Sequence, residues 1–204
     1  MKSRLFHILI VLILGALLTI HSGCASSPSS RFYILSALDT MSPEMKLPED
    51  ERCLSIGIGP INIPDYLDQP KIVTRSALNE VALAEFDRWA ERLRDSLARV
   101  LAKNLSTLLC TKTIAFFPWR GVISFDYRVE MEVLRMDGSL GGNVSLEAWW
   151  MVFSGDGKRM LLAKKSSFNE VVGGQDYRSL VAAQSRALGH LSLEIAEAIK
   201  NLPK

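Results

Sequence analysis

The hydrophobic pattern of the chain changes period along its length, and this change restricts the fold more than any other feature. Between Trp89 and Leu109, apolar residues recur at the spacing of one buried helix face. From Phe125 to Val133 they alternate with charged residues, which is typical of a strand with one buried face. A chain with both periods must pack a helix against a sheet.

The remaining sequence adds more strands and a second helix. Apolar residues from Leu180 to Leu202 recur with helical spacing. Gly155-Asp156-Gly157 is typical of a hairpin turn, so the last three strands are expected to form an antiparallel meander. We predict a single α/β (α+β) domain, in which two amphipathic helices cover one face of a mostly antiparallel sheet. Strands are predicted at 32–35, 54–59, 72–75, 80–85, 113–117, 125–133, 144–153 and 160–172.

The N-terminus has the features of a bacterial lipoprotein signal. A basic start is followed by an uncharged apolar run at 8–20 and by two small residues before Cys24. The run is short for a membrane span, which needs about 20 apolar residues. We predict cleavage before Cys24 and its lipidation with palmitate-like acyl chains. An ordinary secretory signal or an uncleaved anchor is the alternative, because His21 stands where lipoprotein signals usually carry Leu.

The chain is therefore expected to have three parts. A signal peptide covers 1–23, a lipidated Cys with a flexible Ser/Pro-rich tether covers 24–31, and the folded domain covers 32–204. Removal of the signal takes away two of the 24 basic residues and no acidic one, which leaves 22 of each. Nucleic acid is excluded as a partner, because its binders carry an excess or a cluster of Lys and Arg.

Residues suited to catalysis or metal binding are scarce. His190 would be the single histidine of the mature chain, and the helical spacing places neither a nucleophile nor a paired metal ligand beside it. We expect it at the surface of the C-terminal helix. Cys53 and Cys110 lack the spacing of metal ligands, and no phosphate-binding glycine motif occurs. We therefore expect no enzymatic activity, no metal and no cofactor.

Cys53 and Cys110 have two interpretations. Export places them in an oxidising compartment, where they are able to form a disulfide. Both stand near the starts of predicted strands, so they approach each other if those strands are neighbours. Two separately buried thiols explain the sequence equally well, since Cys is among the most buried residue types.

Several segments follow one another as in a known family, and together they span nearly the whole mature chain. The matching segments are Cys24 with its tether, Phe32-Tyr33-Ile34-Leu35, Gly59-Pro60, Ile63-Pro64-Asp65-Tyr66-Leu67-Asp68-Gln69-Pro70, Ile72-Val73 with Arg75, Ala84-Glu85-Phe86-Asp87-Arg88-Trp89-Ala90-Glu91, Asn104-Leu105 and Pro118-Trp119. The most specific segments are 63–70 and 84–91. In this order of segments the chain resembles the ABC-type transport auxiliary lipoproteins of the PqiC/YmbA kind.

The resemblance implies an outer-membrane lipoprotein that faces the periplasm. It would work beside an MCE-domain protein in a system that moves lipids between membranes and maintains envelope integrity. It would be a binding component, and a homo-oligomer is left open. The alternative function is a periplasmic lipid-binding domain that itself carries an acyl chain. That would need an apolar cavity between helices and sheet, where we expect large side chains to fill the space.

The proline-bounded loop at 63–70 is the expected contact with a partner. Prolines limit the freedom that is lost on binding, and exposed aromatic and Arg side chains anchor interfaces. Trp89 and one of Trp149 and Trp150 are expected in the core, since adjacent residues of a strand point to opposite faces. The candidate contact residues are Asp65, Tyr66, Leu67, Asp68 and Arg88.

Overall fold

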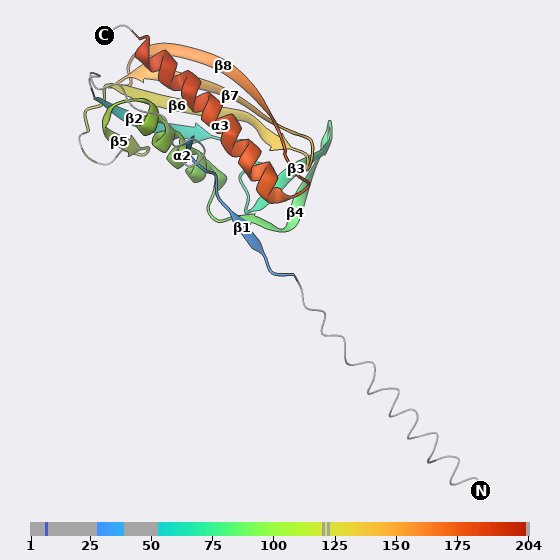
Figure 1. Cartoon of the computed structure of the whole chain (residues 1–204). Coiled ribbons are helices and arrows are strands. Elements are labelled where there is room, and N and C mark those ends of the chain that lie inside the picture. Colours follow the sequence, from blue (N-terminus) through green and yellow to red (C-terminus); the bar gives the residue numbers. More distant parts are fainter. Residues whose placement is uncertain (1–6, 8–27, 39–52, 120, 122, 203–204) are drawn as a thin grey trace.

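The computed structural model describes residues 7, 28–38, 53–119, 121 and 123–202, so Cys24 and all of the predicted signal segment except residue 7 lie outside the described residues. A five-stranded sheet has the order β5-β2-β6-β7-β8, and a three-stranded sheet has the order β1-β4-β3 (Figure 1). The elements are β1 (Arg31–Tyr33), β2 (Leu54–Asn62), β3 (Lys71–Ala77), β4 (Glu80–Trp89), α2 (Leu93–Leu108), β5 (Thr111–Phe116), β6 (Tyr127–Gly138), β7 (Asn143–Ser154), β8 (Met160–Val171) and α3 (Tyr177–Lys200).

The predicted α+β class is confirmed. Helices α2 and α3 pack against each other and cover one face of the five-stranded sheet (Figure 1). Strands β6, β7 and β8 form the expected antiparallel meander. Pairing elsewhere is more mixed than expected, because β2 runs parallel to β5 and β6, and β1 runs parallel to β4. Of the helices in the described ranges, none is long and apolar enough to cross a membrane.

Alternate residues of β7 point toward the helices and form the centre of the core. Trp150 is buried and donates from its indole Nε1 to Ser166 Oγ at 3.0 Å, while Trp149 is exposed. The expectation that one of these tryptophans is core is confirmed, as is the burial of Trp89. Large side chains from α2 and the sheet pack together in the core between the helices and the sheet. Among those fully buried are Leu97, Leu101, Leu105, Met131 and Leu146.

Most strand boundaries differ from the expectation by a few residues, and the changes in β2 and β4 matter most for the site. Strand β2 continues through Pro60 to Asn62, because its pairing with β6 shifts register at this point, where a missing N–H is tolerated. Strand β4 extends to Trp89, so α2 begins only at Leu93. The extension is stabilised by β1, which pairs with residues 87–89.

The segment after β1 is attached to both helices. Ser36 N donates to Ser185 Oγ of α3 at 3.0 Å, and Leu38 N donates to Asn104 Oδ1 of α2 at 2.8 Å. Asn104 Nδ2 also donates to Ser192 Oγ at 2.9 Å, in a buried bond between the helices. These bonds give β1 a fixed place on the domain.

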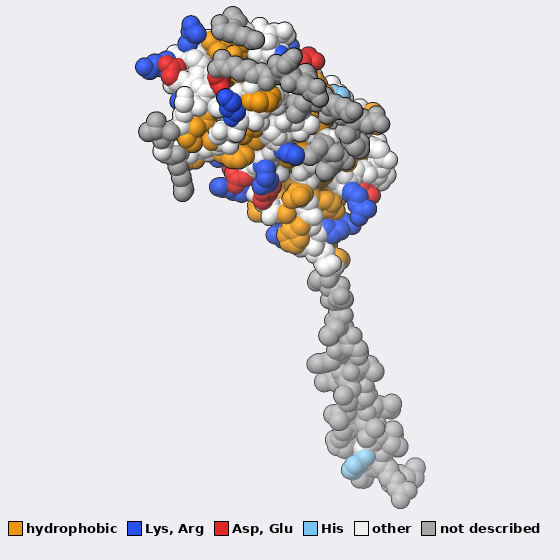
Figure 2. Space-filling view, turned by 60° about the vertical axis from the view of Figure 1, so that its left-hand side comes forward, with side chains coloured by type: hydrophobic (Ala, Val, Ile, Leu, Met, Phe, Trp, Pro, Cys, Tyr) orange, Lys and Arg blue, Asp and Glu red, His pale blue; other side chains and the backbone are white. Residues whose placement is uncertain are grey.

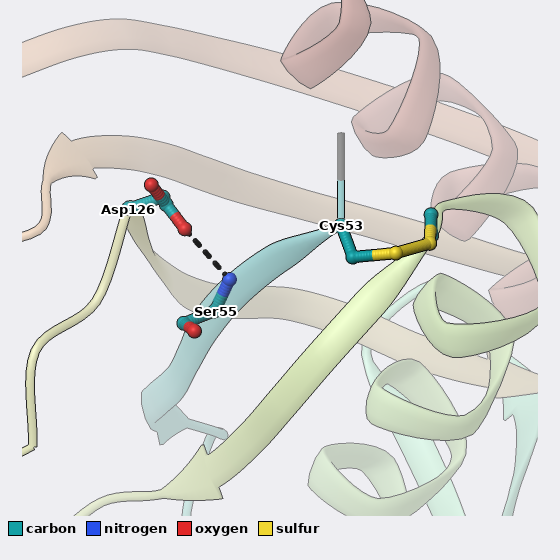
Figure 3. Close-up of a disulfide and its surroundings, with 4 residues drawn as sticks. Cys53, Ser55 and Asp126 are labelled. Carbon is teal, nitrogen blue, oxygen red and sulfur yellow. Dashed lines mark hydrogen bonds between the residues drawn. A yellow bond between two sulfur atoms is a disulfide. The ribbon is translucent and has the colours of Figure 1, made fainter. Parts of the chain in front are cut away.

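Cys53 and Cys110 form a disulfide (Figure 3). It joins the residue before β2 to the residue before β5, 57 positions apart, with Cα atoms 4.4 Å from each other. The two strands are parallel neighbours, and Leu54 N donates to Cys110 O at 2.7 Å. Figure 3 also shows Ser55 N donating to Asp126 Oδ2 at 2.8 Å, so the segment that leads into β6 is attached to the same strand.

Candidate functional site

The two most family-specific segments, 63–70 and 84–91, meet in the structure. Trp89 N at the end of β4 donates to Pro70 O at 2.8 Å. Arg94 Nη2 in the first turn of α2 donates to Asp68 Oδ2 at 2.7 Å. The loop before β3 and the junction between β4 and α2 therefore form one continuous surface.

A pocket of about 390 Å³ lies at this junction, and we call it the junction pocket. Trp89 is nearly buried and gives it an aromatic wall, and the remainder of the lining combines three charged side chains with Gln69 and Pro70. Asp68 is paired with Arg94 and Glu91 with Arg99, which holds the two acidic groups in place. The lining contains no Cys, His, Ser or Lys. Its residues are Asp68, Gln69, Pro70, Trp89, Glu91 and Arg92.

The predicted exposure of Leu67 was wrong. Leu67 is 2% exposed and belongs to the hydrophobic core, and its N–H donates to Pro64 O at 2.9 Å within a tight turn. The ring of Tyr66 is half-buried against the core, and its hydroxyl donates inward to Asp137 Oδ2 at 2.7 Å. The exposed positions of the turn are those of Asp65 and Asp68.

Asp137 is a fully buried carboxylate at the end of β6 with four donors. Besides Tyr66, Arg75 donates from Nε to Oδ1 at 2.8 Å and from Nη2 to Oδ2 at 2.7 Å, and Arg135 Nε donates to Oδ1 at 2.9 Å. Burial raises the pKa of Asp137, but the bonds from Arg75, Tyr66 and Arg135 outweigh it and hold this pKa below its ordinary value. Burial and the bond to Asp137 raise the pKa of Tyr66 to about 12.

This carboxylate network joins three parts of the fold. Arg75 lies on β3 of the small sheet, Asp137 on β6 of the large sheet, and Tyr66 in the 63–70 loop. It therefore fixes the loop that lines the junction pocket. The sequence analysis did not identify the network, because Asp137 lies beyond the alternating run that ends at Val133. Strand β6 also carries Arg128, Glu130, Glu132 and Arg135, so nothing in its sequence set Asp137 apart.

The other predicted site residues lie in different places. Of the five candidate contacts, only Asp68 lines the junction pocket. Arg88 precedes Trp89 on β4 and points to the opposite face of the strand. His190 is exposed on α3, where its Nε2 lies 3.1 Å from Glu170 Oε1, so its predicted surface position is confirmed.

Comparison with known proteins identifies the family. The family model described as "ABC-type transport auxiliary lipoprotein component" matches residues 33–196. Among curated proteins, none matches the chain. The crystal structure of an uncharacterized protein is similar with a TM-score of 0.67 and 16% identity, covering 84% of this chain and 99% of that one. The crystal structure of protein XCC0632 from Xanthomonas campestris is similar with a TM-score of 0.65 and 15% identity, and the match covers 83% of this chain and 94% of that one.

At these identities the two structures show a shared fold and nothing more about function. The family match is broader evidence, because it includes the 63–70 loop, the end of β4, all of α2 and most of α3. The resemblance seen in the sequence is thereby confirmed, and the chain belongs to the family of ABC-type transport auxiliary lipoprotein components.

Proposed function

We propose that the protein is a non-catalytic binding component of an MCE-type system that moves lipids between membranes. Acyl chains on Cys24 would hold it at the outer membrane, with the domain in the periplasm. Membership of the family supports the roles of lipoprotein and transport auxiliary component. The MCE-domain partner and the outer membrane rest on the segments in which the sequence resembles the PqiC/YmbA proteins.

The main structural support for this proposal is the junction pocket. It is formed by the two segments that are most specific to the family, and it combines a buried aromatic wall with a charged rim. Protein interfaces commonly have this arrangement, with an apolar or aromatic centre inside a polar rim. The carboxylate network holds the 63–70 loop in place, which lowers the entropy lost on binding. We propose that the pocket receives an apolar side chain of the MCE-domain partner.

A charge reversal at the rim tests the partner site. Arg92 is suitable because its side chain is 73% exposed and its ion pair with Asp95 is a surface pair of small value. Arg92→Glu also places a negative charge at the N-terminus of α2, where the helix dipole favours it. We expect co-purification of the MCE-domain protein with the tagged lipoprotein to fall by about tenfold, the equivalent of ~1.4 kcal/mol.

The matched control is Arg159→Glu, which reverses an exposed arginine in the turn between β7 and β8. It should co-purify with the partner as the parent protein does. Normal co-purification of a folded Arg92→Glu variant would show that the partner binds elsewhere.

The anchor is tested by Cys24→Ser. Two acyl chains hold a protein stably on a membrane, whereas one is marginal. We expect the variant in the soluble fraction and the parent in the outer-membrane fraction of a density gradient. Ala25, rather than Asp, follows the cysteine, which in this class of lipoprotein directs sorting to the outer membrane. Retention of Cys24→Ser in sedimented membranes would contradict lipid anchoring at this residue.

A further inference from the structure

Two large apolar side chains next to the tether are exposed to solvent. Phe32 is 65% exposed and Ile34 is 58% exposed, whereas Tyr33 and Leu35 between and after them turn inward. The alternation follows from the extended backbone, in which successive residues point to opposite sides. The outward direction of Phe32 and Ile34 is therefore a property of the fold.

Strong contacts hold this short strand in place. Arg31 is paired with the buried Asp87 through Nε to Oδ1 at 2.8 Å and Nη2 to Oδ2 at 2.9 Å, and Tyr33 OH donates to Asp87 Oδ1 at 2.7 Å. Ala90 N donates to Tyr33 O at 2.9 Å. With the bonds from the following segment to both helices, β1 presents Phe32 and Ile34 from a rigid base.

Two basic residues lie on the same face of the small sheet. Phe32 is the register partner of Arg88 on β4, and Arg88 is the partner of Lys71 on β3. Register partners share a face, so Phe32, Arg88 and Lys71 form a row. In the described part of the chain, neither basic side chain forms an ion pair. We call Phe32, Ile34, Lys71 and Arg88 the β1 patch.

The patch lies where the chain leaves the domain. Figure 2 shows hydrophobic side chains gathered at the end of the domain where the chain leaves it, with Lys or Arg and some Asp or Glu side chains near them. An apolar centre with cations beside it suits the surface of a phospholipid bilayer, where apolar groups enter the interface and cations meet phosphates.

The length of the tether keeps this patch near the bilayer. Phe32 follows Cys24 by eight residues. A fully extended chain of that length spans at most about 28 Å, and a flexible Ser-rich one averages about 16 Å. At such distances the tether gives the patch an effective concentration of millimolar order at the membrane surface. Even a weak contact between patch and membrane is then populated.

We propose that Phe32 and Ile34 enter the interfacial region of the membrane in which Cys24 is anchored, while Lys71 and Arg88 contact lipid phosphates. The domain then has a preferred orientation on the bilayer instead of swinging freely on its tether. This inference rests on the proposed lipidation of Cys24, and its test separates the two.

Site-specific photocrosslinking tests the contact. The full mature lipoprotein carries p-benzoylphenylalanine in place of Phe32 and is reconstituted into vesicles of phosphatidylethanolamine and phosphatidylglycerol. The control replaces Leu78, which is 86% exposed in the turn between β3 and β4. Strand β4 separates this turn from the residues that pair with β1, a distance of about 23 Å at the rise of a strand. After irradiation, mass spectrometry should find at least tenfold more lipid adduct at position 32 than at position 78.

Equal yields at the two positions would overturn the inference. A crosslink from position 32 to a second copy of the chain would also overturn it, because the β1 edge would then be a protein interface. The same probe in place of Ile34 repeats the experiment independently and should give lipid adducts too. The intact mass reports the acyl chains separately: an unlipidated protein refutes the anchor, whereas a lipidated protein without lipid adducts refutes only the membrane contact.

Discussion

Replacing Tyr66 by Phe removes one of the four hydrogen bonds to Asp137 and leaves the ring in place. A hydrogen bond to a charged group contributes about 1.5–3 kcal/mol to stability. The Oδ2 atom that loses the hydroxyl still accepts from Arg75 Nη2 at 2.7 Å, so the carboxylate is not left unsatisfied. We therefore expect Tyr66→Phe to lower the free energy of unfolding at pH 7 by an amount at the lower end of this range, about 1.5–2 kcal/mol.

The difference in free energy of unfolding between the parent and Tyr66→Phe should depend on pH. The fold raises the pKa of Tyr66 from 10.0 to about 12, so this stabilisation is complete below pH 10 and is lost as the pH rises through 12. Two pKa units correspond to about 2.7 kcal/mol, an upper bound because Tyr66 is partly exposed and solvent screens the interaction. Phenylalanine does not ionise, so the parent and the variant should converge in stability between pH 10 and 12.

Lowering the pH should also reduce this difference in stability, because Asp137 becomes protonated. Its pKa is held below the ordinary 3.8, so its stabilisation is present above that value and is lost as the pH falls through the lower pKa of the folded state. The hydroxyl of Tyr66 then faces a protonated acid, and the difference between parent and variant should shrink there too.

Urea unfolding followed by circular dichroism at about pH 3, 7, 9 and 11 measures these differences. The control is Tyr127→Phe, a partly buried tyrosine on β6 for which the described residues provide no hydrogen bond to the hydroxyl. The Tyr127→Phe change should alter the free energy of unfolding by no more than about 0.5 kcal/mol. Equal losses for Tyr66→Phe and Tyr127→Phe at pH 7 would refute the view that the network holds the loop.

Two further perturbations test the loop and the disulfide. Leu67→Ala should cost about 2–5 kcal/mol because the side chain is in the core, whereas Asp65→Ala in the same turn should stay within about 0.5 kcal/mol; equal melting temperatures would contradict the buried placement. Reduction of the Cys53–Cys110 disulfide, which closes a separation of 57 residues, should lower the free energy of unfolding by roughly 4 kcal/mol. Two free thiols in the denatured, unreduced mature protein would show that the disulfide is absent.

The regular elements were predictable because their patterns are local. The helical spacing before Leu109 and the strict alternation after Phe125 each depend on neighbours along the chain, and α2, β6, β7 and β8 follow them. The end of β4 did not follow the local pattern. The helical spacing begins at Trp89, but this residue belongs to β4, because β1 pairs with residues 87–89 from a distant part of the sequence.

The inward direction of Tyr66 and Leu67 was not predicted for the same reason: it depends on distant parts of the chain. Prolines on both sides suggested a surface loop that exposes its aromatic residue. The partner of Tyr66 is Asp137, 71 positions away, and no pattern within the loop indicates it. Asp68, which was predicted as a contact residue, is exposed in the turn, because an acidic side chain is rarely buried.

Strand β4 connects the two proposed contacts and makes them separable. Trp89 points into the junction pocket, and Arg88, on the opposite face of the strand, belongs to the β1 patch. A membrane contact on one face therefore leaves the pocket on the other face open to a protein. We expect Phe32→Ser to lose the contact with lipid and keep the MCE-domain partner, and Arg92→Glu to do the reverse. If Phe32→Ser also lost the partner in co-purification, patch and pocket would be one protein interface, and the orientation proposed for the domain would be wrong.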